Sequence, residues 1–209
     1  MTHLYDVAAG TVTGRAHLLA GRNGQDAFAV ERAGGGAVAV VCDGCGGEPR
    51  SEIGAVLGAR LVARALARER DLDVVRRDVL AGIARVADAA GADVRECLLF
   101  TVVAAVLRGG NALVVTCGDG VVAVDGAVRA MGPYAAPPYV AYGGAWEVLH
   151  DGPASTVLVG TDGAADLPSL DAFWSDDRVF RNPDMVRRRL WLARPADDAT
   201  VAVIRRRTP

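Results

Sequence analysis

An apolar run that stops abruptly at an aspartate constrains this chain more than any other stretch: Ala37 to Gly47, AVAVVCDGCGG. Small and β-branched residues without a polar interruption predict a buried strand. The strand ends on Asp43, so it delivers that carboxylate to the rim of a sheet, where a metal or a substrate can reach it. Alternatively, Asp43 and Gly44 form only a turn, in which the aspartate bonds its own backbone and the glycine takes a positive φ. A carboxylate near a core needs a cation or a cap, because leaving it unpaired is costly.

The size and charge of the chain limit its fold and its partners. A length of 209 residues with 51% hydrophobic and 23% charged content suits one sizeable core, so we expect residues 1–209 to form a single domain. The net charge is -2 and the arginines are spread along the chain, which indicates no nucleic-acid partner. The chain contains no lysine, which excludes a P-loop lysine and a Schiff-base lysine.

The four cysteines do not indicate a disulfide framework, since Cys42, Cys97 and Cys117 lie inside apolar runs. Cys42 and Cys45 form a CxxC motif, but neither a second CxxC nor a nearby pair of histidines completes a zinc site. No apolar run approaches the roughly 20 residues that cross a bilayer, and no charged-then-apolar leader opens the chain. We therefore expect a cytoplasmic monomer without membrane association.

The residues before the apolar run predict a hairpin. Ala27 to Glu31 form a short apolar strand, and the glycines at Gly34 to Gly36 reverse the chain before the next strand. In such a hairpin Asp26 starts one strand and Asp43 ends the other. Both positions lie at the same end of an antiparallel pair, so the two carboxylates can converge.

Two amphipathic helices should follow and cover a sheet. Pro49 and Ser51 mark the start of the first helix, and apolar residues recur at helical spacing after them. The second helix is predicted over Leu72 to Ala90, with Gly91 ending it.

The second half of the chain is rich in short β-type runs separated by glycine turns. The predicted strands are Leu98 to Leu107, Ala112 to Cys117, Val121 to Val124 and Ala127 to Met131. We interpret these four as a meander, which means sequential hairpins in one antiparallel sheet. The Pro-, Gly- and Tyr-rich segment from Gly132 to Ala145 should be an irregular excursion over the surface.

The remaining elements are predicted from the same signals. We expect strands at Thr2 to Val12 (an edge strand), Trp146 to Leu149, Thr156 to Gly160 and Ala199 to Ile204, and a helix from about Pro183 to Leu192. The arginine-rich end of the chain is expected to be solvated.

Carboxylates recur at the margins of the apolar strands. They are Asp26, Asp43, Asp162, the pair Asp197 and Asp198, and Asp119 in a turn that follows a strand. Hard oxygen ligands without histidine are what Mg²⁺ or Mn²⁺ prefers. Two such ions roughly 4 Å apart can share a bridging water and stabilise the charge of an in-line displacement at phosphorus.

Six motifs occur in a fixed order: QDA (Gln25 to Ala27), VCDGCGG (Val41 to Gly47), Phe100-Thr101, CGDG (Cys117 to Gly120), GTDG (Gly160 to Gly163) and DDATVAVI (Asp197 to Ile204). This series resembles the metal-dependent PPM-type (type 2C) serine/threonine protein phosphatases. It is most similar to their small bacterial branch, in which His17 and Gln25 of G-x-x-H…QDA are typical. The resemblance covers nearly the whole chain and implies an α+β fold. In that αββα four-layer sandwich, two packed antiparallel sheets are flanked by helix pairs, with the metals at one end.

The resemblance also implies roles for single residues. Asp43 would bridge two metal ions, the Gly44 carbonyl would bind one of them, Asp162 and Asp197 would complete the other, Asp26 would act through metal-bound water, and Asp119 could help to hold a third, weaker ion. Asp43, Asp26 and Arg22 would then be the catalytic residues. The family has Asp followed by Asn where this chain has Asp197 and Asp198. Asp198 should therefore face solvent or cap a backbone group, and Asp198→Asn should be nearly silent.

Three departures from the family pattern matter. Family members often carry DGHGG, whose histidine can donate a proton to the leaving group, whereas this chain has Cys45 at that position, a weaker match as an acid. Arg22 lies one residue away from the usual phosphate-binding arginine, so an ordinary solvated arginine is the alternative. GDG replaces the usual GDS. His17 is either a satisfied turn histidine or a functional one.

By resemblance, the chain is an enzyme, a hydrolase that acts on phosphoserine or phosphothreonine of proteins through a dinuclear-metal-activated water. Its cofactors would be Mn²⁺ or Mg²⁺, and its partner in bacterial signalling would be a phosphorylated protein, the substrate of a serine/threonine kinase. The alternative is a catalytically impaired, phosphatase-like pseudoenzyme that acts as a phosphoprotein-binding regulator, with a small-molecule phosphatase as a third. The retained carboxylates favour the enzyme, and the missing histidine and the short excursion favour the pseudoenzyme.

Overall fold

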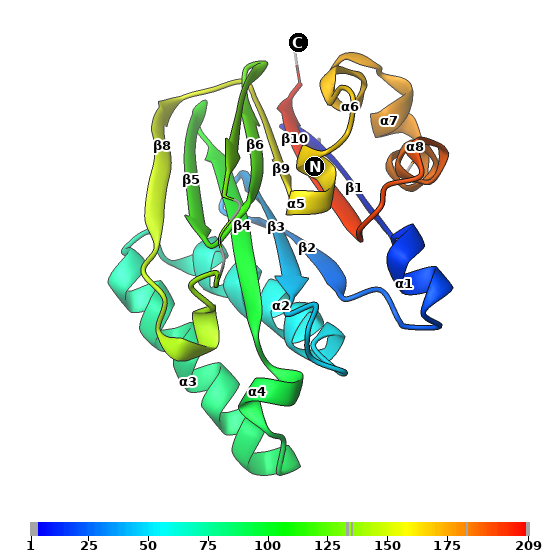
Figure 1. Cartoon of the computed structure of the whole chain (residues 1–209). Helices are drawn as coiled ribbons and strands as arrows, with labels where there is room; N and C mark the ends of the chain where they lie inside the picture. Colours follow the sequence, from blue (N-terminus) through cyan, green and yellow to red (C-terminus); the bar gives the residue numbers. More distant parts are fainter. Residues whose placement is uncertain (1–3, 133, 135, 183, 208–209) are drawn as a thin grey trace.

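Two five-stranded antiparallel sheets lie face to face at the centre of the protein (Figure 1). The computed structural model describes residues 4–132, 134, 136–182 and 184–207. Sheet A has the order β1 (Tyr5–Val12), β10 (Ala199–Arg206), β9 (Thr156–Gly160), β6 (Gly120–Val124) and β7 (Ala127–Met131). Sheet B has the order β2 (Asp26–Ala33), β3 (Gly36–Gly44), β4 (Phe100–Arg108), β5 (Asn111–Cys117) and β8 (Glu147–Pro153). The prediction of β1 as an edge strand is confirmed.

The uninterrupted apolar run of β3 reflects burial on both faces of sheet B. Ala39 and Val41 pack between the two sheets, among residues of β9 and β10. Val40 and Cys42 point the other way and pack against the helices outside the sheet. Successive side chains alternate between faces, and here both faces are covered, so the strand needs apolar residues at every position.

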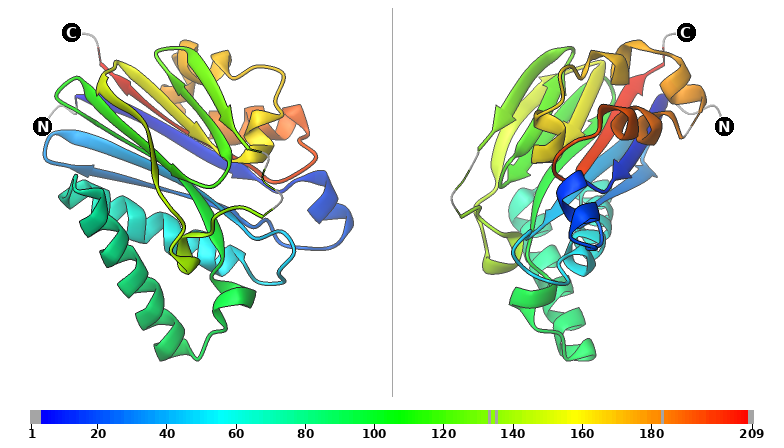
Figure 2. Two further views of the ribbon diagram at one scale, coloured as in Figure 1. Left: turned by 60° about the vertical axis from the view of Figure 1, so that its left-hand side comes forward. Right: turned by 45° about the vertical axis from the view of Figure 1, so that its right-hand side comes forward.

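Two long helices, α2 (Glu52–Arg68) and α3 (Leu72–Ala90), cover the outer face of sheet B (Figures 1 and 2). Gly91, with φ of 58°, ends α3 at the predicted residue. Small residues let α2 approach the sheet closely, because a Cβ on Gly58 would lie only 2.4 Å from the Phe100 ring. A short helix that the sequence did not indicate, α4 (Val94–Cys97), precedes β4. Within the described part of the chain, no helix is long and apolar enough to cross a membrane.

Short helices cover the outer face of sheet A (Figure 2). They are α5 (Asp162–Ala165), α6 (Asp171–Ser175), α7 (Arg178–Arg181) and α8 (Met185–Ala193). The predicted αββα layering is confirmed, although short helices replace a long pair on this side. The helix predicted from Pro183 corresponds to α8, while Pro183 itself lies outside the described residues. Two further short elements, α1 (Arg15–Leu19) and the 3₁₀ turn η1 (Val140–Tyr142), flank the sheets.

The predicted meander is wrong in one respect, since its four strands do not share a sheet. β4 pairs with β5 in sheet B, β6 pairs with β7 in sheet A, and the chain crosses between the sheets after Cys117. Gly118 and Gly120 have φ of 111° and 134°, a conformation that favours glycine. Short β-type runs with a glycine turn look alike in a hairpin and in a crossover, which is why the sequence did not distinguish them.

The β2–β3 hairpin is confirmed, and its register pairs Asp26 directly with Asp43. On the other side of β3, Asp43 pairs with Thr101 of β4. The arginine-rich end is exposed at Arg206 and Arg207, as predicted, and half-buried at Arg205, while Thr208 and Pro209 lie outside the described residues. Arg205 and Arg207 both form ion pairs with Asp6. The hairpin register therefore fixes where the two predicted carboxylates lie.

Candidate metal centre

An acidic cavity of about 170 Å³ lies where strands of both sheets end. Its lining residues are His17, Asp43, Gly44, Cys45, Gly46, Thr101, Asp119, Pro137, Tyr139, Asp162 and Asp197. Four of these residues are aspartates, and all four were singled out in the sequence. The cavity therefore offers a ligand set dominated by carboxylate oxygens, which suits Mg²⁺ or Mn²⁺.

Each of the four aspartates comes from the margin of a strand. Asp43 lies at the end of β3 in sheet B. Asp162 lies two residues after β9 and opens α5, and Asp197 lies two residues before β10, so both are attached to sheet A. Asp119 lies in the crossover from β5 to β6. Both sheets and the segment between them thus contribute to one cavity.

Asp26, which pairs with Asp43 across β2 and β3, is not among the residues that line the cavity. It is only 9% exposed, and its Oδ2 accepts a hydrogen bond of 2.7 Å from the Thr161 hydroxyl. Its Oδ1 is buried and has no hydrogen-bond partner among the described residues. An unpartnered buried carboxylate oxygen opposite Asp43 is the feature expected where a cation or its bound water is to be held.

The carboxylates around the cavity destabilise one another's charged forms. Burial raises the pKa of Asp26 to about 7. Burial and the charge of Asp119 raise the pKa of Asp162 to about 6. Burial and the charges of Asp26 and Asp162 raise the pKa of Asp43 well above its usual value. Burial also raises the pKa of Asp119. A divalent cation would offset this repulsion, so the residues present fit such an ion.

Asp198 does not face solvent but caps backbone groups, which is one of the two positions predicted for it. Its side chain is 3% exposed and accepts hydrogen bonds from the Gly14 amide (2.7 Å), the Gln25 amide (2.5 Å) and His17 Nδ1 (2.9 Å). His17, Asp197 and Asp198 place ligand atoms within 4.8 Å of one another, but both oxygens of Asp198 already accept hydrogen bonds. The expectation that Asp198→Asn is nearly silent conflicts with these contacts.

Arg22 lies outside the acidic cavity, on the far side of the loop that follows β3. Its guanidinium donates hydrogen bonds of 2.8 Å to the carbonyls of Gly46 and Glu48. The structure thus does not bring Arg22 together with the aspartates, and it gives Arg22 a role in holding the loop. A phosphate-binding role for Arg22 stays a prediction.

Cys45 and Tyr139 form a contact inside the cavity, with the Tyr139 hydroxyl 3.1 Å from the Cys45 sulfur. Burial and the Cys45 thiol raise the pKa of Tyr139. Sequence analysis missed Tyr139, which lies in the Pro- and Gly-rich excursion before η1. An aromatic residue in that segment was the available signal, but nothing local places it over the end of β3.

Comparisons with known proteins agree with this fold. The family model described as Protein phosphatase 2C matches residues 13–194. Among solved structures, the serine/threonine phosphatase Stp1 from Staphylococcus aureus matches with a TM-score of 0.71 and 11% identity, covering 97% of this chain and 95% of that chain. The S. agalactiae serine/threonine phosphatase matches with a TM-score of 0.66 and 16% identity, covering 97% and 100%. The catalytic domain of the phosphatase PstP, in complex with 2 manganese ions, matches with a TM-score of 0.62 and 20% identity, covering 96% and 97%. No curated protein matches.

Proposed function

Because the chain belongs to the protein phosphatase 2C family, we propose that it hydrolyses phosphoserine or phosphothreonine on proteins, using two divalent cations, Mn²⁺ or Mg²⁺, in the acidic cavity. The observation that carries this proposal is the gathering of aspartates from both sheets around one cavity, with Asp26 paired to Asp43 across β2 and β3. Mutual repulsion in the absence of a cation is consistent with a site built for metal.

The cavity residues would divide the binding of the cations. Asp43, the Gly44 carbonyl, Asp162 and Asp197 would hold the two cations, and Asp119 would be available to a third ion. Bound cations would lower the pKa of a water molecule to make it a nucleophile and would neutralise the charge of the phosphate. Asp26, which is buried and pairs with Asp43 across β2 and β3, would hold a proton or accept a hydrogen bond at its unpartnered Oδ1.

His17 is the group that fits proton donation to the leaving serine or threonine oxygen. His17 lines the cavity. Cys45 also lines it and occupies the sequence position of the histidine that is common in the family. Asp198 engages Nδ1 of His17, which orients the ring and leaves Nε2 as the nitrogen that can exchange a proton with a ligand.

Phosphoprotein binding without turnover is the second candidate function. The placement of Arg22 outside the cavity and the Cys45 substitution favour it. Phosphate release from a phosphoserine peptide, with and without millimolar Mn²⁺, separates the two. Mn²⁺-dependent release supports hydrolysis, and retained peptide binding without release supports the second candidate.

Removal of divalent cations should lower the melting temperature, and the loss should be larger at neutral than at acidic pH. The pKa of Asp26 is about 7 and that of Asp162 about 6 in the folded protein, above the usual value. The cation-free protein is therefore most stable at a pH below the pKa that these two aspartates have in the unfolded chain. Its stability decreases as the pH rises through their higher pKa values in the folded protein. Melting curves in EDTA and in Mn²⁺ at about pH 5 and about pH 8 measure this. Identical curves with and without Mn²⁺ would argue for the binding function.

His17→Gln should lower kcat on a phosphoserine peptide about 100-fold, because proton donation to an alkoxide is lost. The same variant should turn over p-nitrophenyl phosphate almost normally, since that leaving group is weakly basic and needs no acid. As the matched cavity control, Cys45→Ser should stay near wild type on both substrates, and Cys45→His should be at least as active. An equal loss on both substrates in His17→Gln would show a structural role for the histidine instead.

A further inference from the structure

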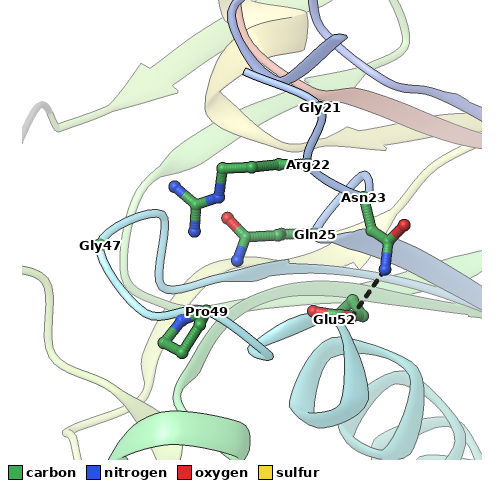
Figure 3. Close-up of a pocket in the computed structure, with 7 residues that line it drawn as sticks. All are labelled: Gly21, Arg22, Asn23, Gln25, Gly47, Pro49 and Glu52. Carbon is green, nitrogen blue, oxygen red and sulfur yellow. Dashed lines mark hydrogen bonds between the residues drawn. The ribbon is translucent and has the colours of Figure 1, made fainter.

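Figure 3 shows a second hollow, of about 450 Å³. It neighbours the acidic cavity, because the adjacent residues Gly46 and Gly47 line the cavity and the hollow respectively. We name it the Gln25 pocket; it is lined mainly by Arg22, Asn23, Gln25, Gly47, Pro49 and Glu52. The loop after β3 separates the two, because Gly44 to Gly46 line the acidic cavity and Gly47 lines the Gln25 pocket. A ligand that crosses this loop can therefore reach both.

Two side-chain oxygen atoms of residues that line the Gln25 pocket, Gln25 Oε1 and Glu52 Oε2, are buried and have no hydrogen-bond donor among the residues that the structure describes. Gln25 is 2% exposed, and its Nε2 donates a 2.7 Å hydrogen bond to the Glu48 carbonyl. That bond fixes the orientation of the amide, since the reverse orientation would place two acceptors together. Glu52 Oε1 accepts a 3.2 Å hydrogen bond from Asn23, which leaves Oε2 without a partner.

The two unpartnered oxygens of the pocket suit a hydrogen-bond donor that carries positive charge. Both unpartnered atoms are acceptors, and Glu52 adds a carboxylate charge. Arg22, the one cationic side chain among the described residues that line the pocket, donates to the Gly46 and Glu48 carbonyls and points away from Glu52 (Figure 3). A guanidinium presents several donors in a fixed fork and can satisfy two separated acceptors at once.

We infer that the Gln25 pocket binds an arginine side chain of the phosphorylated substrate, so that the protein prefers phosphosites with a nearby arginine. This inference rests on the proposed function, because the phosphoryl group must occupy the acidic cavity while the arginine occupies the pocket. Neighbouring residues of one loop, Gly46 and Gly47, line the two sites, so the arginine lies within about three residues of the phosphoserine.

Matched phosphoserine peptides test the inference, with arginine or the uncharged isostere citrulline at each of the three positions on either side. At one position we expect kcat/KM to be about tenfold higher for arginine, as one charge-assisted hydrogen bond would give. In Glu52→Gln the ratio of the two peptides should fall to near one. Glu69→Gln, a matched change on the residue that follows the other end of α2, should keep the wild-type ratio.

Equal kcat/KM for arginine and citrulline at every position, or an unchanged ratio in Glu52→Gln, would overturn the inference and show a pocket filled only by water. Turnover of p-nitrophenyl phosphate, which has no flanking residue, separates this failure from failure of the proposed function. If neither that ester nor the peptides are hydrolysed, the proposed function fails. The inference is then decided by fluorescence anisotropy of the same peptides in Mn²⁺, where equal affinities would reject it.

Discussion

Asp43→Asn should abolish Mn²⁺-dependent hydrolysis and yet raise the melting temperature of the protein in EDTA. Burial and the charges of Asp26 and Asp162 raise the pKa of Asp43, so its charged form destabilises the cation-free fold at neutral pH. An amide of the same shape removes that repulsion. It also removes the central ligand of the cavity, and the loss of metal-stabilised charge should reduce kcat/KM by about 10³-fold or more.

The opposite signs of these two effects make the Asp43 experiment decisive. The order of the melting temperatures should reverse between the two conditions: the variant should be more stable in EDTA, and the wild type should be more stable in Mn²⁺. Asp151→Asn, which changes an exposed aspartate paired with Arg70, should leave both curves and the activity unchanged. A lower melting temperature of Asp43→Asn in EDTA would mean that the carboxylate holds the fold rather than a cation.

Asp198→Asn should destabilise the protein by about 3 kcal/mol, whereas Asp197→Asn should leave the cation-free protein as stable as wild type. The Asp198 carboxylate is buried and accepts from two amides and His17. Hydrogen bonds to a charged group contribute roughly 1.5–3 kcal/mol each, and an asparagine can accept at only one of its two terminal atoms. Asp197 is exposed at the cavity and uses one oxygen only for the adjacent Asp198 amide.

The pair of variants separates folding from metal binding within two adjacent residues. Urea unfolding in EDTA measures the stability loss of Asp198→Asn. The Mn²⁺ dependence of hydrolysis measures Asp197→Asn, which should need far more Mn²⁺ or show no turnover at all. Each variant is the control for the other, because both replace an aspartate by asparagine. If Asp197→Asn were the unstable variant and Asp198→Asn the inactive one, the assignment of ligand and cap would be reversed.

Local signals explain the parts of the fold that could be predicted. The β2–β3 hairpin follows from two apolar runs around a glycine reversal, and α3 from a long periodic pattern ended by Gly91. The crossing from β5 to β6 could not be predicted, because sheet membership depends on tertiary packing. The short helices α5 to α7 were missed, since each has only one turn or so and no repeated apolar spacing.

The same distinction applies to the site. Convergence of Asp26 and Asp43 could be predicted because one hairpin sets their register. The burial of Asp198 against Gly14 could not, since this contact joins residues 184 positions apart. Tyr139 reaches the cavity from an irregular segment, where periodicity carries no information. Arg22 was singled out by the resemblance to the family, which did not show that loop carbonyls already engage its guanidinium.

The origin of the cavity aspartates in both sheets has a mechanical consequence. Asp43 belongs to sheet B, Asp162 and Asp197 are attached to sheet A, and Asp119 lies in the segment that joins them. Ions shared by these carboxylates would tie the two layers together at one end, in addition to the apolar packing between them. Any sliding of one layer over the other would separate the ligands. Ion affinity would then report on the rigidity of the sandwich, and a change that loosens the interlayer packing would also weaken ion binding.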